Sequence, residues 1–281
     1  MNSANERSVM TTSSEQQQKD LIRDRFTRTA EVFGDYAVSY RVRFAESLMR
    51  LVRAGKSDLV IDLACGPGTL ALRFAPKVRH VYGLDLTPAM LSRAREAAAN
   101  EGLANIAFAL GDAQNLPFPD RSLDIAVTSY SLHHMPDPAR VVREMARVAK
   151  PGGRVGIIDI FASEDPTAAA LSNRIEKTRD PSHTRTLAQS ELAQLLADAG
   201  LRVLGSEVEE APRSFDHWLH VAGWQRGDLA YIETRRLMED SMRDDATGFH
   251  AKFAPADGSK PGEPPDIQMV NPTFFIAAIK P

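Results

Sequence analysis

Five short apolar runs alternate with amphipathic stretches between residues 57 and 161, and this alternation constrains the fold more than any other feature of the chain. Short apolar runs bounded by turn residues indicate buried strands, whereas apolar side chains at helical spacing indicate helices. Strands that alternate with helices form parallel βαβ units, so we expect a doubly wound α/β sheet with helices on both faces. Right-handed crossovers place the loops after the strands along one edge, where ligands of such sheets bind. The expected strands are DLVIDLA, HVYGLDL, NIAFALGD, LDIAVTSY and RVGIIDIF.

The segments on either side of this core differ in composition. Residues 1–18 are polar and predict a disordered tail, whereas residues 19–56 carry apolar side chains at helical spacing and predict N-terminal helices. Residues 162–281 predict further helices and the last two strands, with a helical insertion at 212–262 before a final strand that contains a proline. We therefore expect one domain over residues 19–281, built on a mostly parallel sheet of about seven strands.

Composition excludes several classes of protein. The net charge is −3, so no nucleic-acid partner is expected. Cys65 is the only cysteine, which excludes a disulfide framework, and we expect a small buried side chain rather than a nucleophile. No spaced ligand set predicts a metal site. The polar start lacks a signal-peptide core, and no apolar run approaches the roughly 18 residues that span a bilayer, so we expect a cytoplasmic protein without a membrane span.

A glycine-rich turn follows the first expected strand. Gly66 and Gly68 let the backbone approach a ligand where a side chain would collide, although a tight strand-to-helix turn needs the same residues. With Ala71 they also match a variant of the dinucleotide fingerprint. The glycines alone therefore do not choose between cofactors.

Three carboxylates come at three successive strand ends. Asp62 precedes the glycine turn, where an acid attracts an ammonium and repels a pyrophosphate. Asp85 ends the second strand, where two oxygens can accept both hydroxyls of a ribose, and Asp112 is placed to accept from an adenine amino group. Each acid taken singly can instead be a helix N-cap or a loop residue. Together they suit a cofactor that has an ammonium and a sulfonium but no phosphates.

Four motifs now point to a family. In order and spacing, VIDLACGPGTL, GLDLTPAML, GDAQNLPFPDRSLDIAVTSYSLHHMPDP and RVAKPGGRVGIIDI resemble the motif series of class I S-adenosylmethionine-dependent methyltransferases. The resemblance is strongest to the subgroup around the ubiquinone/menaquinone C-methyltransferases (methyltransferase type 11). It implies a Rossmann-like sheet whose seventh strand is antiparallel, an N-terminal helical lid, and S-adenosylmethionine as the methyl donor, with S-adenosylhomocysteine as product. Ala64 stands where the usual glycine-rich loop has its first glycine, which is a mild change.

The resemblance also assigns cofactor residues. It implies that the turn after the first strand lines the methionine end, that the second strand end holds the ribose and packs on the adenosine, and that the third reads the adenine edge. One further residue faces the cofactor after the fourth strand. In that order the residues are Asp62, Ala64, Gly66 and Gly68; Asp85, Leu86 and Met90; Asp112 and Ala113; and Ser129.

The acceptor side is less clearly encoded. Methyl transfer from a sulfonium is an in-line displacement, which mainly requires alignment, and a base is needed only for an acceptor that arrives protonated. His133 and His134 follow the fourth strand and are the candidate bases, although histidines in such loops often only satisfy local hydrogen bonds. The further substrate-side candidates, each with a core, cap or loop alternative, are Phe33, Tyr36, Ser131, His183, Arg185 and Trp218.

We interpret the chain as an enzyme that methylates a small organic acceptor, which can be a carbon, oxygen or nitrogen nucleophile. A nicotinamide oxidoreductase shares the glycine turn and Asp85, but it leaves Asp62 and Asp112 unexplained and would be disfavoured by an antiparallel seventh strand. A non-catalytic S-adenosylmethionine-binding protein would lack an open acceptor pocket. A macromolecule methyltransferase would need a basic face.

Overall fold

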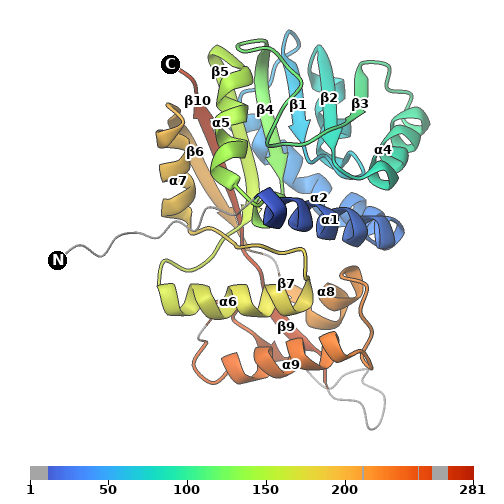
Figure 1. The fold of residues 1–281 in the computed structure, drawn as a ribbon, viewed down its shortest axis with the longest axis vertical. Coiled ribbons are helices and arrows are strands. Elements are labelled where there is room, and N and C mark those ends of the chain that lie inside the picture. Colours follow the sequence, from blue (N-terminus) through green and yellow to red (C-terminus); the bar gives the residue numbers. More distant parts are fainter. Residues whose placement is uncertain (1–11, 211, 246, 255–264) are drawn as a thin grey trace, which may run out of the picture.

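The computed structural model describes residues 12–210, 212–245, 247–254 and 265–281, and no side chain at residue 12 or between residues 33 and 43. Its centre is a seven-stranded sheet in the order β3-β2-β1-β4-β5-β10-β6 (Figure 1). The first five strands pair in parallel, as predicted. The strands are β1 (Leu59–Leu63), β2 (His80–Asp85), β3 (Ile106–Leu110), β4 (Leu123–Ser129), β5 (Ala149–Ile160), β6 (Arg202–Glu209) and β10 (Thr273–Ile279).

The last strand runs against its neighbours. β10 lies between β5 and β6 and pairs antiparallel with both, from Thr273 opposite Ile160 and Glu209 to Ile279 opposite Arg154 and Arg202. The predicted antiparallel seventh strand is therefore confirmed, and with it the doubly wound, mostly parallel sheet. This topology also counts against the nicotinamide oxidoreductase alternative.

Helices cover both faces of the sheet, each through a separate apolar cluster. On one face α2 (Ala30–Leu51) and α3 (Thr69–Phe74) bury Phe44, Leu48 and Phe74 against β1, β4 and β10. On the other face α5 (Pro138–Val148) and α7 (Gln189–Asp198) bury Val141, Met145 and other apolar side chains. Next to α2, α4 (Pro88–Asn100) packs along β3, and two short 3₁₀ turns, η1 (Ala75–Lys77) and η2 (Leu132–His134), complete the core.

A second, smaller body lies below the sheet in Figure 1. Its helices are α6 (Pro166–Arg179), α8 (Phe215–Val221) and α9 (Leu229–Ser241), and its three-stranded sheet has the order β7-β9-β8. These strands are β7 (Pro212–Ser214), β8 (Lys252–Phe253) and β9 (Ile267–Val270). The predicted insertion is thus not purely helical, because strands of so few residues show too little alternation to be recognised. Pro272 separates β9 from β10, so the expected single final strand is divided between the two sheets.

The N-terminal helix is longer than predicted. α1 (Thr12–Arg28) includes residues 12–18, which we expected in the tail, while residues 1–11 lie outside the described part. Gln18 is buried because its side-chain amide donates to the carbonyl oxygens of Ser182, at 2.5 Å, and His134, at 3.3 Å. A polar side chain can therefore anchor a helix whose apolar pattern is weak.

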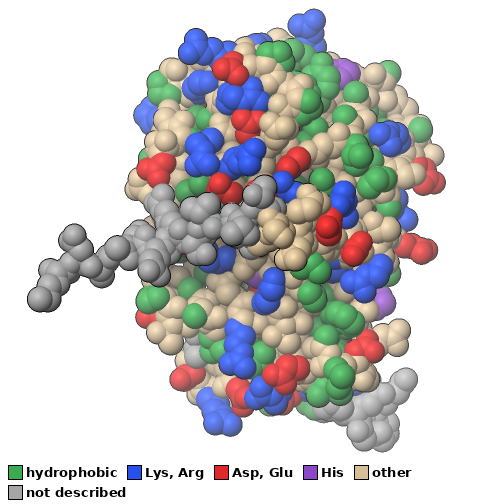
Figure 2. Space-filling view, in the orientation of Figure 1, with side chains coloured by type: hydrophobic (Ala, Val, Ile, Leu, Met, Phe, Trp, Pro, Cys, Tyr) green, Lys and Arg blue, Asp and Glu red, His purple; other side chains and the backbone are tan. Residues whose placement is uncertain are grey.

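The surface in Figure 2 has Lys and Arg side chains interspersed with Asp and Glu side chains. No face-wide basic patch appears on this side of the molecule among the described residues, such as a macromolecule methyltransferase would need. No helix in the described part of the chain is long and apolar enough to cross a membrane.

Candidate active site

The carboxyl ends of β1, β2, β3 and β4 meet α1 around a pocket of about 860 Å³. The pocket contains most of the residues predicted to bind a cofactor, together with two residues predicted on the acceptor side. These residues are Ala64, Gly66, Asp85, Leu86, Met90, Asp112, Ala113 and Ser129, with Ser131 and His134. Loops far apart in the sequence therefore come together at the predicted edge of the sheet.

The turn after β1 depends on glycine at two positions for different reasons. Gly66 has a φ of +55° and no atom within 4 Å of an added Cβ, so its requirement is conformational. Gly68 has a φ of +84°, and a Cβ there would lie 3.1 Å from the Cβ of Ala94 on α4. Gly66 thus gives the pocket-lining turn its backbone conformation, and Gly68 lets α3 and α4 pack closely.

Asp85 connects the ends of β1 and β2. One carboxylate oxygen accepts from the backbone N–H of Gly66 and the other from that of Thr87, each at 2.8 Å. Burial raises the pKa of Asp85, while the two backbone N–H groups act in the opposite direction. Asp85 is also one of the residues that line the pocket.

Asp62 and Gly68 are the two predicted cofactor residues that do not line the pocket. Asp62 is fully buried, and its Oδ2 accepts from the backbone N–H of Ala71 in the first turn of α3 at 3.1 Å. Its Oδ1 has no hydrogen-bond partner among the described residues, and burial raises the pKa of Asp62 well above its ordinary value. Asp62 thus holds the first turn of α3 through one oxygen, and its assignment to the cofactor stays a prediction.

α1 covers the β3 end of the pocket. Lys19, Ile22 and Phe26 line the pocket from one face of this helix. The Lys19 ammonium lies 2.8 Å from Asp112 Oδ2 and 2.5 Å from Glu15. No motif in the sequence singled out Lys19, because its partner lies on a loop that is distant in the sequence.

A second pocket of about 570 Å³ adjoins the first. The two pockets adjoin at Phe26, Tyr130 and His134, which line both. The remaining lining residues come from the core and from the smaller body. They are Arg25, His133, Ile160, Glu176, Arg179, Asp180, Arg213, Trp218, Val221 and Asn271.

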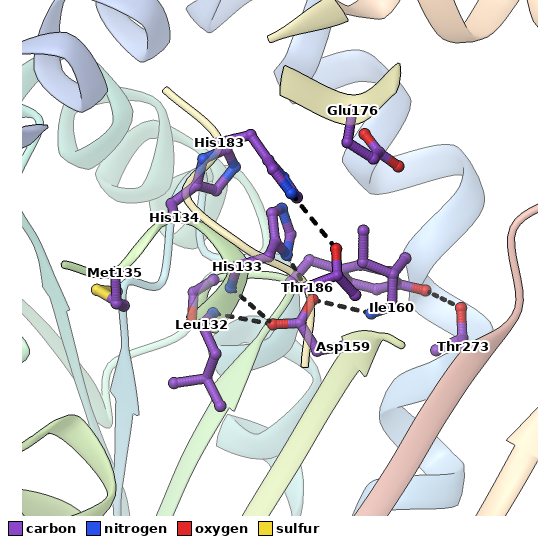
Figure 3. A network of polar contacts seen from close by, with 12 residues as sticks. Leu132, His133, His134, Met135, Asp159, Ile160, Glu176, His183, Thr186 and Thr273 are labelled. Carbon is purple, nitrogen blue, oxygen red and sulfur yellow. Dashed lines mark hydrogen bonds and ion pairs between the residues drawn. The ribbon is translucent and has the colours of Figure 1, made fainter. Parts of the chain in front are cut away.

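His133 is held by an acid that the sequence analysis did not single out. Its Nδ1 lies 2.5 Å from Asp159 Oδ1, and Asp159 also accepts from the backbone N–H groups of Leu132, at 2.9 Å, and Ile160, at 2.8 Å (Figure 3). This arrangement fixes the ring and directs its Nδ1–H to the carboxylate, leaving Nε2 as the nitrogen that Asp159 does not engage. The available signal was an acid inside the apolar run RVGIIDI.

His134 and His183 are more deeply constrained. His134 Nδ1 lies 3.1 Å from the Ser182 carbonyl oxygen, and burial, then the neighbouring His133, lower the pKa of His134 well below its ordinary value. His183 Nε2 donates to Asn173 Oδ1 at 3.0 Å, and burial, then His133 and Arg179, lower the pKa of His183 to about 2. Both rings are therefore neutral near pH 7.

Several substrate-side predictions are corrected. His183 is fully buried and lines neither pocket because it bonds to α6. Arg185 is exposed and pairs with Glu191 at 2.8 Å, near the start of α7. Trp218 does line the second pocket, whereas the side chains of Phe33 and Tyr36 lie outside the described part.

Comparisons with known proteins agree with this geometry. Residues 60–153 match the family described as "Methyltransferase domain". The chain is 33% identical over 198 residues to the "uncharacterized methyltransferase YcgJ" of Bacillus subtilis, covering 70% of this chain and 78% of that protein. It is 37% identical over 121 residues to a demethylmenaquinone methyltransferase of Listeria monocytogenes, covering 42% of this chain and 51% of that enzyme.

Two solved structures are similar over most of their length. The crystal structure of YcgJ matches with a TM-score of 0.73 at 28% identity, covering 85% of this chain and 98% of that one. That of a putative methyltransferase from Bacillus halodurans matches with a TM-score of 0.74 at 27% identity, covering 84% and 98%.

Proposed function

Since this chain belongs to the class I S-adenosylmethionine-dependent methyltransferases, we propose that the larger pocket holds the methyl donor and that a small organic acceptor binds in the adjoining one. When bound, S-adenosylmethionine supplies a sulfonium methyl group; the acceptor atom forms a bond to the methyl carbon while the carbon–sulfur bond breaks, and sulfur keeps the electron pair. The observation that carries the proposal is that the two pockets adjoin at Phe26, Tyr130 and His134, which line both.

The residues at the strand ends fit such a donor. In this proposal the Asp85 carboxylate accepts the ribose hydroxyls, with Leu86 and Met90 against the adenosine and Asp112 and Ala113 at the adenine edge. The fit is supported by the unsatisfied Asp62 Oδ1 behind the turn and by Gly66, where an added Cβ meets no protein atom within 4 Å. Ala64, Gly66 and Ser129 then lie nearest the methionine part.

The Asp159–His133 pair supplies a base on the acceptor side. With Nδ1–H directed to Asp159, the His133 ring presents Nε2 to accept a proton from an acceptor that arrives protonated. The same contact lets the carboxylate stabilise the charged ring that results. His134, which is neutral and lines both pockets, helps to exclude water from the contact between donor and acceptor.

A labelled-methyl experiment tests the small-acceptor proposal. The protein is incubated with methyl-labelled S-adenosylmethionine and, separately, with a small-metabolite extract, total RNA and a denatured protein extract. We expect label to enter the small-molecule fraction, and we expect Trp218→Ala, which opens the second pocket, to reduce that transfer. Transfer to RNA or protein alone would contradict the proposal.

A further inference from the structure

The lysine that α1 contributes to the larger pocket is paired with two carboxylates. Its ammonium lies 2.8 Å from Asp112 Oδ2 and 2.5 Å from Glu15 Oε1, and the Lys19 side chain is 17% exposed. Burial alone would lower the pKa of Lys19, but the hydrogen bonds to Asp112 and Glu15 raise that pKa above its ordinary value. Lys19 therefore stays charged in the lining of the pocket.

Both carboxylates are held by a buried glutamine. The backbone N–H of Gln114 donates to Asp112 Oδ1 at 2.9 Å, and the side-chain amide of Gln114 donates to Glu15 at 2.6 Å. Gln114 is 1% exposed, and its side-chain oxygen accepts from the backbone N–H of Asp137 at 2.9 Å. The ammonium of Lys19 therefore has a defined position between two fixed partners.

The helix that carries Lys19 is anchored on both sides of it. Before Lys19, the buried Gln18 donates to the Ser182 carbonyl oxygen at 2.5 Å, and after it Arg25, 5% exposed, lies 3.2 Å from Asp180. In Figure 1, α1 lies between the large sheet and the smaller body. The fold therefore sets where this lysine meets the pocket.

Lys19 and Asp112 together offer a hydrogen-bond donor next to an acceptor. An ammonium has three N–H donors, and among the described residues one oxygen each of Glu15 and Asp112 receives two of them. The third can serve a ligand of the pocket. Adenine presents the complementary edge, because its exocyclic amino group donates and the ring nitrogens beside that group accept.

We propose that Lys19 recognises the adenine edge of the methyl donor together with Asp112. The carboxylate accepts from the exocyclic amino group, and the Lys19 ammonium donates to a ring nitrogen next to that group. This inference rests on the proposed function, which puts the donor in the larger pocket. Lys19 is then a specificity-determining residue, because it adds the requirement for an acceptor beside the amino group.

Calorimetric titration of the full chain tests this role. The ligands are S-adenosylhomocysteine and its 1-deaza and 7-deaza analogues, each of which lacks one of the two ring nitrogens nearest the amino group. We expect one analogue to bind about tenfold more weakly than S-adenosylhomocysteine, because a hydrogen bond from a charged donor is lost. The weaker analogue identifies the nitrogen that Lys19 contacts.

Two matched variants separate this contact from a structural role. Lys19→Met keeps an unbranched side chain but removes the donor, so it should bind S-adenosylhomocysteine and the weaker analogue equally well. Lys77→Met, at an exposed position on η1, should keep the tenfold difference. If Lys19 only positioned α1, its replacement would weaken both ligands to the same extent and leave their affinity ratio unchanged.

The outcomes distinguish the two proposals. Absence of S-adenosylhomocysteine binding to the unmodified protein would overturn the proposed function itself. If S-adenosylhomocysteine binds but both analogues match its affinity, or if a folded Lys19→Met protein keeps the tenfold ratio, only the role of Lys19 is overturned. The comparison of analogues in the unmodified protein needs no variant, so it decides the matter even if Lys19→Met fails to fold.

Discussion

Asp159 Oδ1 lies 2.5 Å from His133 Nδ1, so the acid at the end of β5 orients a histidine that lines the second pocket. The two residues are far apart in the sequence but close in space, because β4 and β5 pair in parallel. This pairing places Ser129 opposite Ile158 at the ends of the two strands. The contact is thus a direct product of the sheet register.

Because His133 is proposed to act as a base, its replacement should lower kcat and leave the affinity for S-adenosylhomocysteine nearly unchanged. His133→Gln should lower kcat for a protonated acceptor about a hundredfold, because the base is lost, and leave S-adenosylhomocysteine affinity within about twofold. His220→Gln, at an exposed position on α8, is the matched control and should change neither quantity. An unchanged kcat in a folded His133→Gln protein would remove His133 from the mechanism.

Gly66 and Gly102 form a second matched pair. Both have positive φ and open space around an added Cβ, but only Gly66 lines the pocket proposed to hold the donor. Alanine at either position should lower the free energy of unfolding by about 1–2 kcal/mol through backbone strain. Only Gly66→Ala should weaken binding of S-adenosylhomocysteine, which calorimetry measures. Equal loss of affinity in Gly102→Ala would show that the effect is not local.

The buried ion pair of Arg25 and Asp180 predicts a large stability effect. Arg25→Met leaves the carboxylate, which is 2% exposed, without its partner and should lower the free energy of unfolding by about 3–5 kcal/mol in urea titration. Arg23→Met alters an exposed pair with Asp20 on the same helix and should cost less than about 1 kcal/mol. Similar losses of unfolding free energy in both variants would show that the buried pair stabilises the fold no more than the exposed pair does.

Stability should fall as the pH drops below about 6.5. The folded-state pKa of His183 is about 2, below the ordinary 6.5, so in this window the unfolded chain binds a proton that the folded chain does not. The sign is therefore loss of stability on acidification, by about 1.4 kcal/mol between pH 7.5 and pH 5.5 for this residue. His183→Gln should flatten the urea-derived profile by that amount and His220→Gln should not; an equally steep profile in His183→Gln would contradict it.

Much of the core was predictable because each step rested on a local pattern. Apolar runs gave the strands of the large sheet, and their carboxyl ends located Asp85 and Asp112 at one pocket. Asp62 lies at the predicted strand end, but the sequence could not show that one of its oxygens accepts from the backbone N–H of Ala71. Side-chain direction at a strand end depends on the packing of the following helix.

The second pocket was less predictable because it is assembled by long-range contacts. Arg25 belongs to a polar helix with a weak apolar pattern, and its partner Asp180 lies far along the chain. Arg213 is on a three-residue strand that carries no recognisable period. The second pocket therefore depends on tertiary packing between two bodies, which no local motif encodes.

Calorimetric titration of the purified protein with S-adenosylmethionine, S-adenosylhomocysteine and NAD, beside the Asp85→Ala variant, tests the central claim most directly. We predict affinities on the order of micromolar for the two sulfur ligands, no binding of NAD, and a loss of more than about 1 kcal/mol of binding free energy in the variant. Binding of NAD with silence from both sulfur ligands, or unchanged affinity in a folded Asp85→Ala protein, would contradict the account.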